Sequence, residues 1–118
     1  YTLVSEDTYK AATTNGRILA REIDLILVVG KDTPISIWEL VGFMSDTDDA
    51  ARNMVKYYTM GLGAYRRREW QVAIFYFERA LSVCPEDKPS LTLIRRCREF
   101  ETAPPPEEWN GAFKMTFK

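Results

Sequence analysis

In the first part of the chain, apolar side chains either follow one another closely or alternate with polar ones. The stretches ILAREIDLILVV (18–29) and ISIWELV (35–41) are rich in aliphatic and β-branched residues, which predicts two strands. The five residues 30–34 between them fit a hairpin connection. Residues 2–4 predict a further short strand, and Ser5 is a suitable N-cap for a helix after it.

From residue 54 onward, apolar residues recur every three or four positions, which is the period of amphipathic helices. Two helices are predicted within residues 54–84, and Asp87 can cap a third that begins at Lys88. The prolines 104–106 end this helix, and Phe113, Met115 and Phe117 alternate with polar residues as in a short strand. The fold class predicted is therefore α+β, with a hairpin, a helix pair, a capping helix and a C-terminal strand.

Two polar stretches invite a ligand-binding interpretation that their spacing does not support. The acidic residues in SDTDDAARN (45–53) lack the glycine and glutamate of an EF-hand calcium loop, so a linker ending in a helix N-cap is predicted. GKDT (30–33) lacks the spacing of a Walker phosphate loop, and a strand follows it instead of a helix. No metal ligand is predicted in either stretch.

Composition narrows the function classes further. The chain has no histidine, which removes the usual general base of a serine or cysteine nucleophile. Residues 1–52 carry nine acidic and five basic side chains, and residues 53–100 carry five acidic and nine basic ones. This basic excess is too small to predict nucleic-acid binding. The longest apolar run, 25–30, is too short to span a bilayer, so no membrane contact and a cytoplasmic location are expected.

Residues 54–87 resemble one tetratricopeptide repeat of 34 residues. The small residues of this pattern let two antiparallel helices approach closely, while its aromatic residues fill the space around them. The structural positions of the repeat are occupied by Tyr57, Gly61, Trp70, Ala73, Phe77, Ala80 and Pro85. Arg68 stands where the pattern usually has glycine, at the turn between the helices. A lone repeat cannot bury its own flank, so the N-terminal strands or a second copy of the chain are expected to shield it.

Residues 2–42 resemble the C-terminal end of class III adenylate and guanylate cyclase catalytic domains, which close with a strand, a short helix and a hairpin. The matching hairpin positions are occupied by Gly30, Lys31, Pro34, Trp38, Glu39 and Leu40. Bacterial cyclases of this kind also carry tetratricopeptide extensions that end in a proline-tryptophan tail. Residues 104–106, Trp109 and Gly111 fit that ending.

The resemblance implies a segment of the catalytic domain in 1–44, a linker in 45–53, a repeat with a capping helix in 54–103 and a proline-rich tail with a strand in 104–118. Because the chain begins at Tyr1 and not at methionine, we expect it to be a piece of a longer protein. The intact protein would be a bacterial signal-transduction enzyme that converts ATP, or alternatively GTP, to the cyclic nucleotide and pyrophosphate. It would act with Mg²⁺ and as a homodimer.

In this resemblance, Lys31 is the residue that would contact the nucleotide phosphates, since a compact cation opposes their charge. The family's paired metal-binding aspartates have no match in the chain. No catalytic residue and no cofactor are therefore assigned to it, and alone it is expected to be inactive.

A second interpretation is a non-enzymatic adaptor that binds an acidic peptide or protein partner along its helices. The arginines that would meet such a partner are Arg66, Arg67, Arg95 and Arg96. The same arginines also fit ordinary solvated helix faces.

Overall fold

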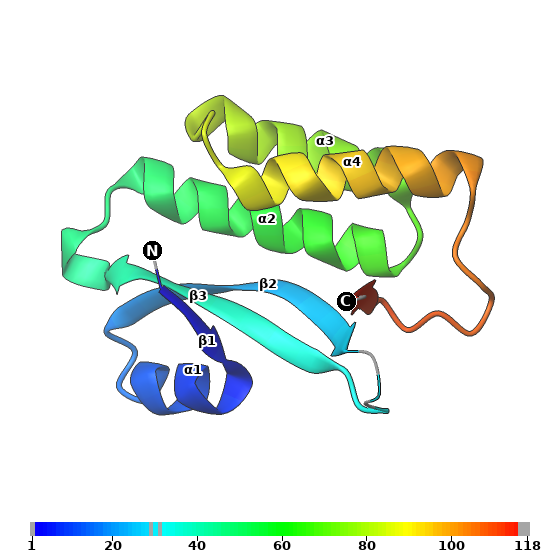
Figure 1. Ribbon diagram of the computed structural model, residues 1–118. Coiled ribbons are helices and arrows are strands. Elements are labelled where there is room, and N and C mark those ends of the chain that lie inside the picture. The colour runs from blue at the N-terminus through cyan, green and yellow to red at the C-terminus, as the bar shows by residue number, and fades with distance from the viewer. Residues whose placement is uncertain (1, 29, 31, 116–118) are drawn as a thin grey trace. The chain divides into compact units, whose positions relative to one another are not determined.

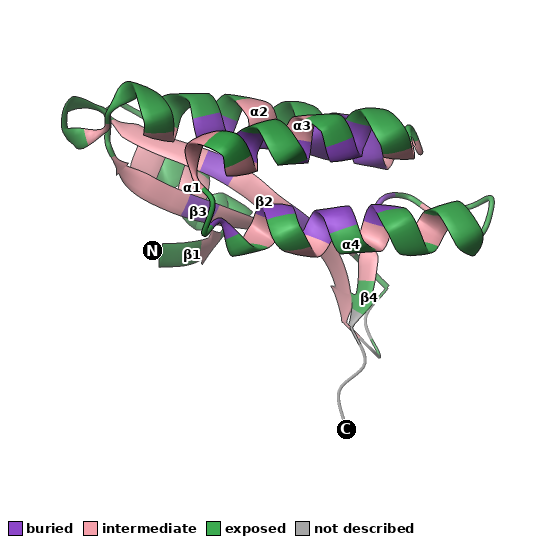
Figure 2. Ribbon diagram, turned by 90° about the horizontal axis from the view of Figure 1, so that it is seen from above, coloured by how far each residue is buried: buried purple, intermediate pink, exposed green. Residues whose placement is uncertain are grey.

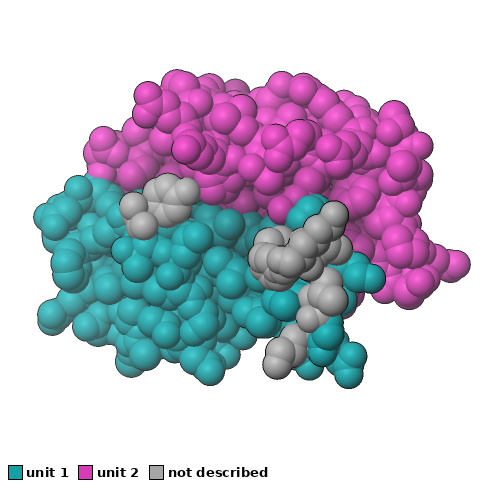
Figure 3. Space-filling view, viewed as in Figure 1, with its two compact units in different colours: residues 1–47, 111–118 teal, residues 48–110 magenta. Residues whose placement is uncertain are grey.

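The computed structural model describes residues 2–28, 30 and 32–115, which form two compact units. The sheet unit holds the described residues of 1–47 and 111–118, and the helical unit holds residues 48–110 (Figure 3). The described residues contain a mixed four-stranded sheet and four α-helices, as expected for an α+β protein. The helical unit is thus inserted in sequence between two strands of the sheet unit.

The sheet has the strand order β1-β3-β2-β4 (Figure 1). Its members are β1 (Thr2–Ser5), β2 (Ile18–Val28), β3 (Ile35–Phe43) and β4 (Phe113–Met115). β3 is antiparallel to β1 and β2, which confirms the hairpin, and it runs two residues further than the pattern predicted. β4 is parallel to β2, where Phe113 to Met115 pair with Ile26 to Val28. Phe117, predicted to continue this strand, lies outside the described residues.

Helix α1 (Glu6–Thr13) packs on the sheet through an aromatic contact. Its N-cap is Ser5, as predicted, whose Oγ accepts a hydrogen bond from the backbone N–H of Thr8 at 3.3 Å. The ring of Tyr9 stacks on Trp38 of β3, with 3.6 Å between the ring centroids and 7° between the planes. This contact places Trp38 on the α1 side of the sheet, and its strand neighbour Glu39 on the opposite side.

The register of β2 against β3 contains irregularities. The pairing passes from Glu22 with Trp38 to Asp24 with Ile37, so one extra residue is inserted in β2. A bulge of this kind reverses the alternation of the strand. Arg21 and Asp24, which would face opposite sides in a regular strand, are therefore both buried, at 2% and 7% exposure. The sequence pattern alone did not predict this.

Helix α2 (Asp49–Arg66) begins inside the stretch predicted as a linker. A short 3-10 turn, Met44–Asp46, comes before it, and Oδ1 of Asp48 accepts the backbone N–H of Ala51 at 2.9 Å. The N-cap was expected, but at Asp48 it lies inside the predicted linker 45–53. Residues 49–53 are therefore helical, and only the part of that stretch before them connects β3 to α2. The cause is the cap itself, because Asp48 satisfies one of the free N–H groups of the first turn.

Helices α3 (Trp70–Val83) and α4 (Lys88–Thr102) complete the helical unit. Asp87 caps α4 as predicted, and its Oδ2 accepts from the backbone N–H and the hydroxyl of Ser90. Along α4 the buried positions recur every three or four residues and form a purple stripe in Figure 2. Cys97 belongs to this stripe, and burial, together with the nearby charge of Glu101, raises the pKa of its thiol to about 12.

A four-ring aromatic cluster joins the ends of the three helices to the tail. Its members, Tyr65, Trp70, Phe100 and Trp109, have centroid separations between 5.1 and 6.1 Å. The proline-tryptophan segment therefore packs against its own helices, as a segment of the helical unit. Aromatic pairs at these distances stabilise beyond the area they bury.

Arg68 connects the interhelix turn to this tail. Its φ of 64° lies in the left-handed region, where a side chain costs about 1 kcal/mol relative to glycine. Its guanidinium donates to the carbonyl oxygens of Pro105, at 3.1 Å, and Pro106, and lies 5.6 Å from the ring centroid of Trp109. The contacts of Arg68 with the tail thus offset its backbone strain.

Two substitutions of Arg68 should separate the cost of its backbone strain from the stabilisation by its contacts. Arg68→Ala keeps the left-handed φ and loses the contacts, so we expect it to lower the free energy of unfolding by about 1–2 kcal/mol. Arg68→Gly loses the same contacts without the strain and should be about 1 kcal/mol more stable than Arg68→Ala. Urea unfolding followed by tryptophan fluorescence would measure both. Equal stability of the two variants would contradict the strain.

Candidate functional site

The hairpin loop between β2 and β3 is the first candidate site. Gly30 has a φ of +86°, which a side chain rarely adopts, and a Cβ at this position would meet nothing within 4 Å. Asp32 and Thr33 are exposed. Lys31, the predicted phosphate contact, lies outside the described residues. The loop comes after Ile26 to Val28 of β2, which pair with β4, so the strand that leads into the loop is held in the sheet.

The hairpin that carries this loop contains a buried ion pair. Nε of Arg21 donates to Oε1 of Glu39 at 2.8 Å, and the two side chains are 1% and 5% exposed. The two residues are register partners on neighbouring strands. On the other face of the hairpin, the hydroxyl of Ser36 donates to Oε2 of Glu22 at 2.7 Å. Charged hydrogen bonds across the strands therefore fix the register on which the position of the loop depends.

The predicted close approach between α2 and α3 occurs at Gly61. A Cβ added there would lie 2.7 Å from the ring of Phe77, which is fully buried. Ala73 and Ala80 are also fully buried, Trp70 is half-buried in the aromatic cluster, and Pro85 is exposed in the turn before α4. The contacts of Gly61 with Phe77 and of Tyr65 with Trp70 make the two helices antiparallel.

Tyr57 occupies a different environment from the one expected of a space-filling residue. It is half-exposed, whereas Tyr58 is fully buried, with its ring 5.2 Å from that of Phe77. Tyr57 instead accepts a hydrogen bond at its hydroxyl from Nη2 of Arg79, at 3.3 Å. Sequence reasoning nominated neither Arg79 nor Tyr58. The spacing of Phe75 and Arg79, four residues apart on one helix, was the available signal for an exposed aromatic-basic pair.

The four arginines proposed for an acidic partner do not form one cluster of equivalent side chains. Arg67 is exposed and forms a 2.8 Å ion pair with Glu69, beside the turn between α2 and α3. Arg66 is half-buried at the end of α2. Arg95 is exposed and Arg96 half-buried, both on α4.

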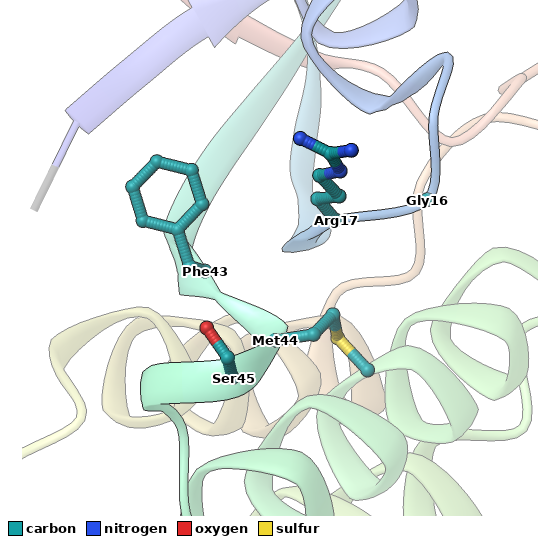
Figure 4. Close-up of a pocket in the computed structure, with 5 residues that line it drawn as sticks. All are labelled: Gly16, Arg17, Phe43, Met44 and Ser45. Carbon is teal, nitrogen blue, oxygen red and sulfur yellow. The ribbon is translucent and has the colours of Figure 1, made fainter.

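An open pocket of about 530 Å³ lies in the sheet unit (Figure 4). It is lined by Gly16, Arg17, Phe43, Met44 and Ser45. The backbone N–H of Met44 donates to the carbonyl of Arg17 at 2.6 Å, which joins the two strands at this end. Of these five residues Arg17 alone is charged, while Phe43 and Met44 are 56% and 36% exposed. This combination defines no reaction.

The residues that the structure describes contain no group of three or more histidine, cysteine, aspartate or glutamate side chains placed to hold a metal ion. None of the helices that they form is both long and apolar enough to cross a membrane.

The comparisons with known proteins give one informative similarity. The chain is 29% identical over 97 residues to a terminal-differentiation-specific adenylate cyclase of Dictyostelium discoideum. The match covers 80% of this chain and 5% of that protein, so the chain spans about a twentieth of its relative's length. No protein-family model matches the chain, and no solved structure gives a significant match. The similarity supports a relationship with an adenylate cyclase.

Proposed function

We propose that the chain is the C-terminal part of a class III nucleotide cyclase, followed by a tetratricopeptide extension that serves interaction or regulation. The observation that carries this proposal is the similarity to an adenylate cyclase over 97 residues. Such a match must include parts of both compact units, because the helical unit holds only residues 48–110. The aligned stretch therefore includes residues of the helical unit as well as residues of the hairpin.

The intact protein would convert ATP to cyclic AMP and pyrophosphate, with Mg²⁺ held by aspartates outside this chain and with two copies of the catalytic domain forming the site. A bacterial origin, a cytoplasmic location and homodimerisation belong to the same proposal. Lys31 would contribute a positive charge to the triphosphate site. The ion pair Arg21–Glu39 and the hydrogen bond from Ser36 to Glu22 would support it by fixing the strands from which its loop extends.

The proposal is tested on the full-length protein with ATP and Mg²⁺. We expect cyclic AMP formation by the full-length protein, none by the 118-residue chain, and a KM for ATP raised by about tenfold in Lys31→Ala. Lys10→Ala, at an exposed position of α1, is the matched control and should leave the KM unchanged. A correctly folded full-length protein that forms no cyclic nucleotide would refute the proposal, and an unchanged KM in Lys31→Ala would remove Lys31 from it.

The role of the extension needs a deletion that spares the sheet. Removing residues 48–110 retains β4, which pairs with β2. The new connection from 47 to 111 must be a flexible linker that runs along β2, because Phe43 pairs with Ile18 at the start of that strand and Phe113 with Ile26 near its end. We expect this variant of the full-length protein to keep its basal activity and to lose regulation or dimerisation that depends on the helices. If activity, dimerisation and regulation were all unchanged, the extension would have no such role.

A further inference from the structure

The outer sides of α2 and α3 meet at an exposed surface of mixed chemistry. Val72, Phe75 and Arg79 recur three or four residues apart on α3 and so lie on one side of it. The hydrogen bond from Arg79 to the hydroxyl of Tyr57 shows that this side adjoins α2. Met60, Val72 and Phe75 are 40%, 43% and 55% exposed, a large exposure for apolar side chains. We call this surface the Arg79 face and define it by Lys56, Tyr57, Met60, Val72, Phe75 and Arg79.

The guanidinium of Arg79 is held by aromatic rings and not by an acid. It lies 5.2 Å from the ring centroid of Tyr57 and 5.9 Å from that of Phe75. Within residues 2–28, 30 and 32–115, no carboxylate forms an ion pair with it, in contrast to Arg21 and Arg67. Its hydrogen bond to Tyr57 uses one of the five N–H donors that a guanidinium offers. Arg79 is thus positioned by its neighbours while most of its donors remain available.

The local field at this surface is positive. The hydrogen bond from Arg79 lowers the pKa of Tyr57, the charge of Arg79 lowers it further, and the charge of Lys56 adds a smaller contribution. The surrounding stretch, residues 53–100, has nine basic and five acidic side chains. An anionic partner would therefore be attracted to this unit before contact and would find a fixed cation at the contact.

We propose that the Arg79 face binds an acidic segment of a partner protein, with a partner carboxylate on the guanidinium of Arg79 and partner apolar side chains against Met60, Val72 and Phe75. A carboxylate matches the planar donors of arginine with two parallel hydrogen bonds. Tyrosine and arginine, here the half-exposed Tyr57 beside the exposed Arg79, are among the residue types that dominate binding energy at protein interfaces. The inference rests on the proposed role of the helices as an interaction module, and it identifies the chemistry of the partner.

A second copy of the chain fits this surface less well. A twofold contact places the same face on both copies, so it would bring two Arg79 guanidinium groups and two Lys56 ammonium groups together. Like charges at such a contact oppose association. The surface therefore favours a partner that supplies the opposite charge.

The test uses the 118-residue chain and two synthetic peptides of about 15 residues, each about four helical turns. One peptide carries leucine and glutamate on one face, and the other replaces each glutamate with glutamine. We expect the glutamate peptide to bind about tenfold more tightly, as measured by calorimetry at low salt, because only it supplies a charge-assisted hydrogen bond. Arg79→Gln should remove this preference. Arg98→Gln, at an exposed position of α4, is the matched control and should retain it.

A second readout follows the surface directly. A carboxylate bound at Arg79 opposes the field of that guanidinium, so the glutamate peptide should raise the pKa of Tyr57 toward its usual value. The difference between wild-type and Tyr57→Phe ultraviolet titrations, with and without peptide, isolates this group.

Three results would overturn the inference: equal affinity for the two peptides, a glutamate preference that survives in Arg79→Gln, or light scattering that shows a dimer abolished by Arg79→Gln. The last result would assign the surface to a second copy. Because peptide binding requires no nucleotide, failure here is distinguishable from failure of the proposed cyclase activity.

Discussion

Glu39→Gln should lower the free energy of unfolding of the sheet unit by about 3–5 kcal/mol. The side chain keeps nearly the same shape, but the buried positive charge of Arg21 then loses the negative charge of Glu39 that opposes it. Both side chains are almost inaccessible, at 1% and 5% exposure, so water cannot solvate the remaining charge. Hydrogen exchange of the β2 and β3 amides in increasing urea would measure the loss.

The chain contains a matched control for this prediction. Arg67 and Glu69 form an ion pair with the same Nε to Oε1 distance, 2.8 Å, but their side chains are 63% and 49% exposed. Glu69→Gln should cost about 0–1 kcal/mol, because solvent and salt screen an exposed pair. If both substitutions cost the same, burial would not determine the effect. A double substitution, Arg21→Met with Glu39→Leu, should recover much of the loss of Glu39→Gln by removing both charges together.

Gly61→Ala and Gly63→Ala should change stability in opposite directions, although the two glycines lie on one helix. A Cβ at Gly61 would approach the Phe77 ring to 2.7, 2.8 and 3.0 Å, and that ring is fully buried. A Cβ at Gly63 would approach only Nη1 at the end of the Arg67 side chain, at 3.3 Å, which can move.

For Gly61→Ala, overpacking of about 1–3 kcal/mol should exceed the gain of up to about 1 kcal/mol in helix propensity. Gly63→Ala should retain most of that gain and stabilise by about 0.5–1 kcal/mol. Hydrogen exchange of the α2 and α3 amides would measure both changes. Stabilisation by Gly61→Ala would show that the close approach of the helices is not required.

Local sequence patterns predicted the elements because each has a local cause. Ser5, Asp48 and Asp87 cap helices through their own side chains, and Gly61 and Phe77 lie where the spacing of small and aromatic residues placed them. The features that the sequence did not predict depend on contacts between residues that are distant along the chain.

The inserted residue in β2 places Arg21 and Asp24 on one side of the strand, and no periodicity in the sequence predicts this insertion. Arg68 acquires its partners only when Pro105 and Pro106 fold back upon the helices. The site was the least predictable part for the same reason. Lys31 was nominated by resemblance, whereas the environment of Arg79 depends on a tyrosine 22 residues earlier in the chain.

The late position of β4 in the chain has a consequence for shortened forms of the protein. Any product that ends before Phe113 lacks the strand that pairs with Ile26 to Val28. The N–H and C=O groups along that margin of β2 would then have no β4 to bond with and would be a template for strands of other molecules. Early stop codons anywhere in the helical stretch are therefore expected to produce aggregation, and not merely a protein that lacks its helices.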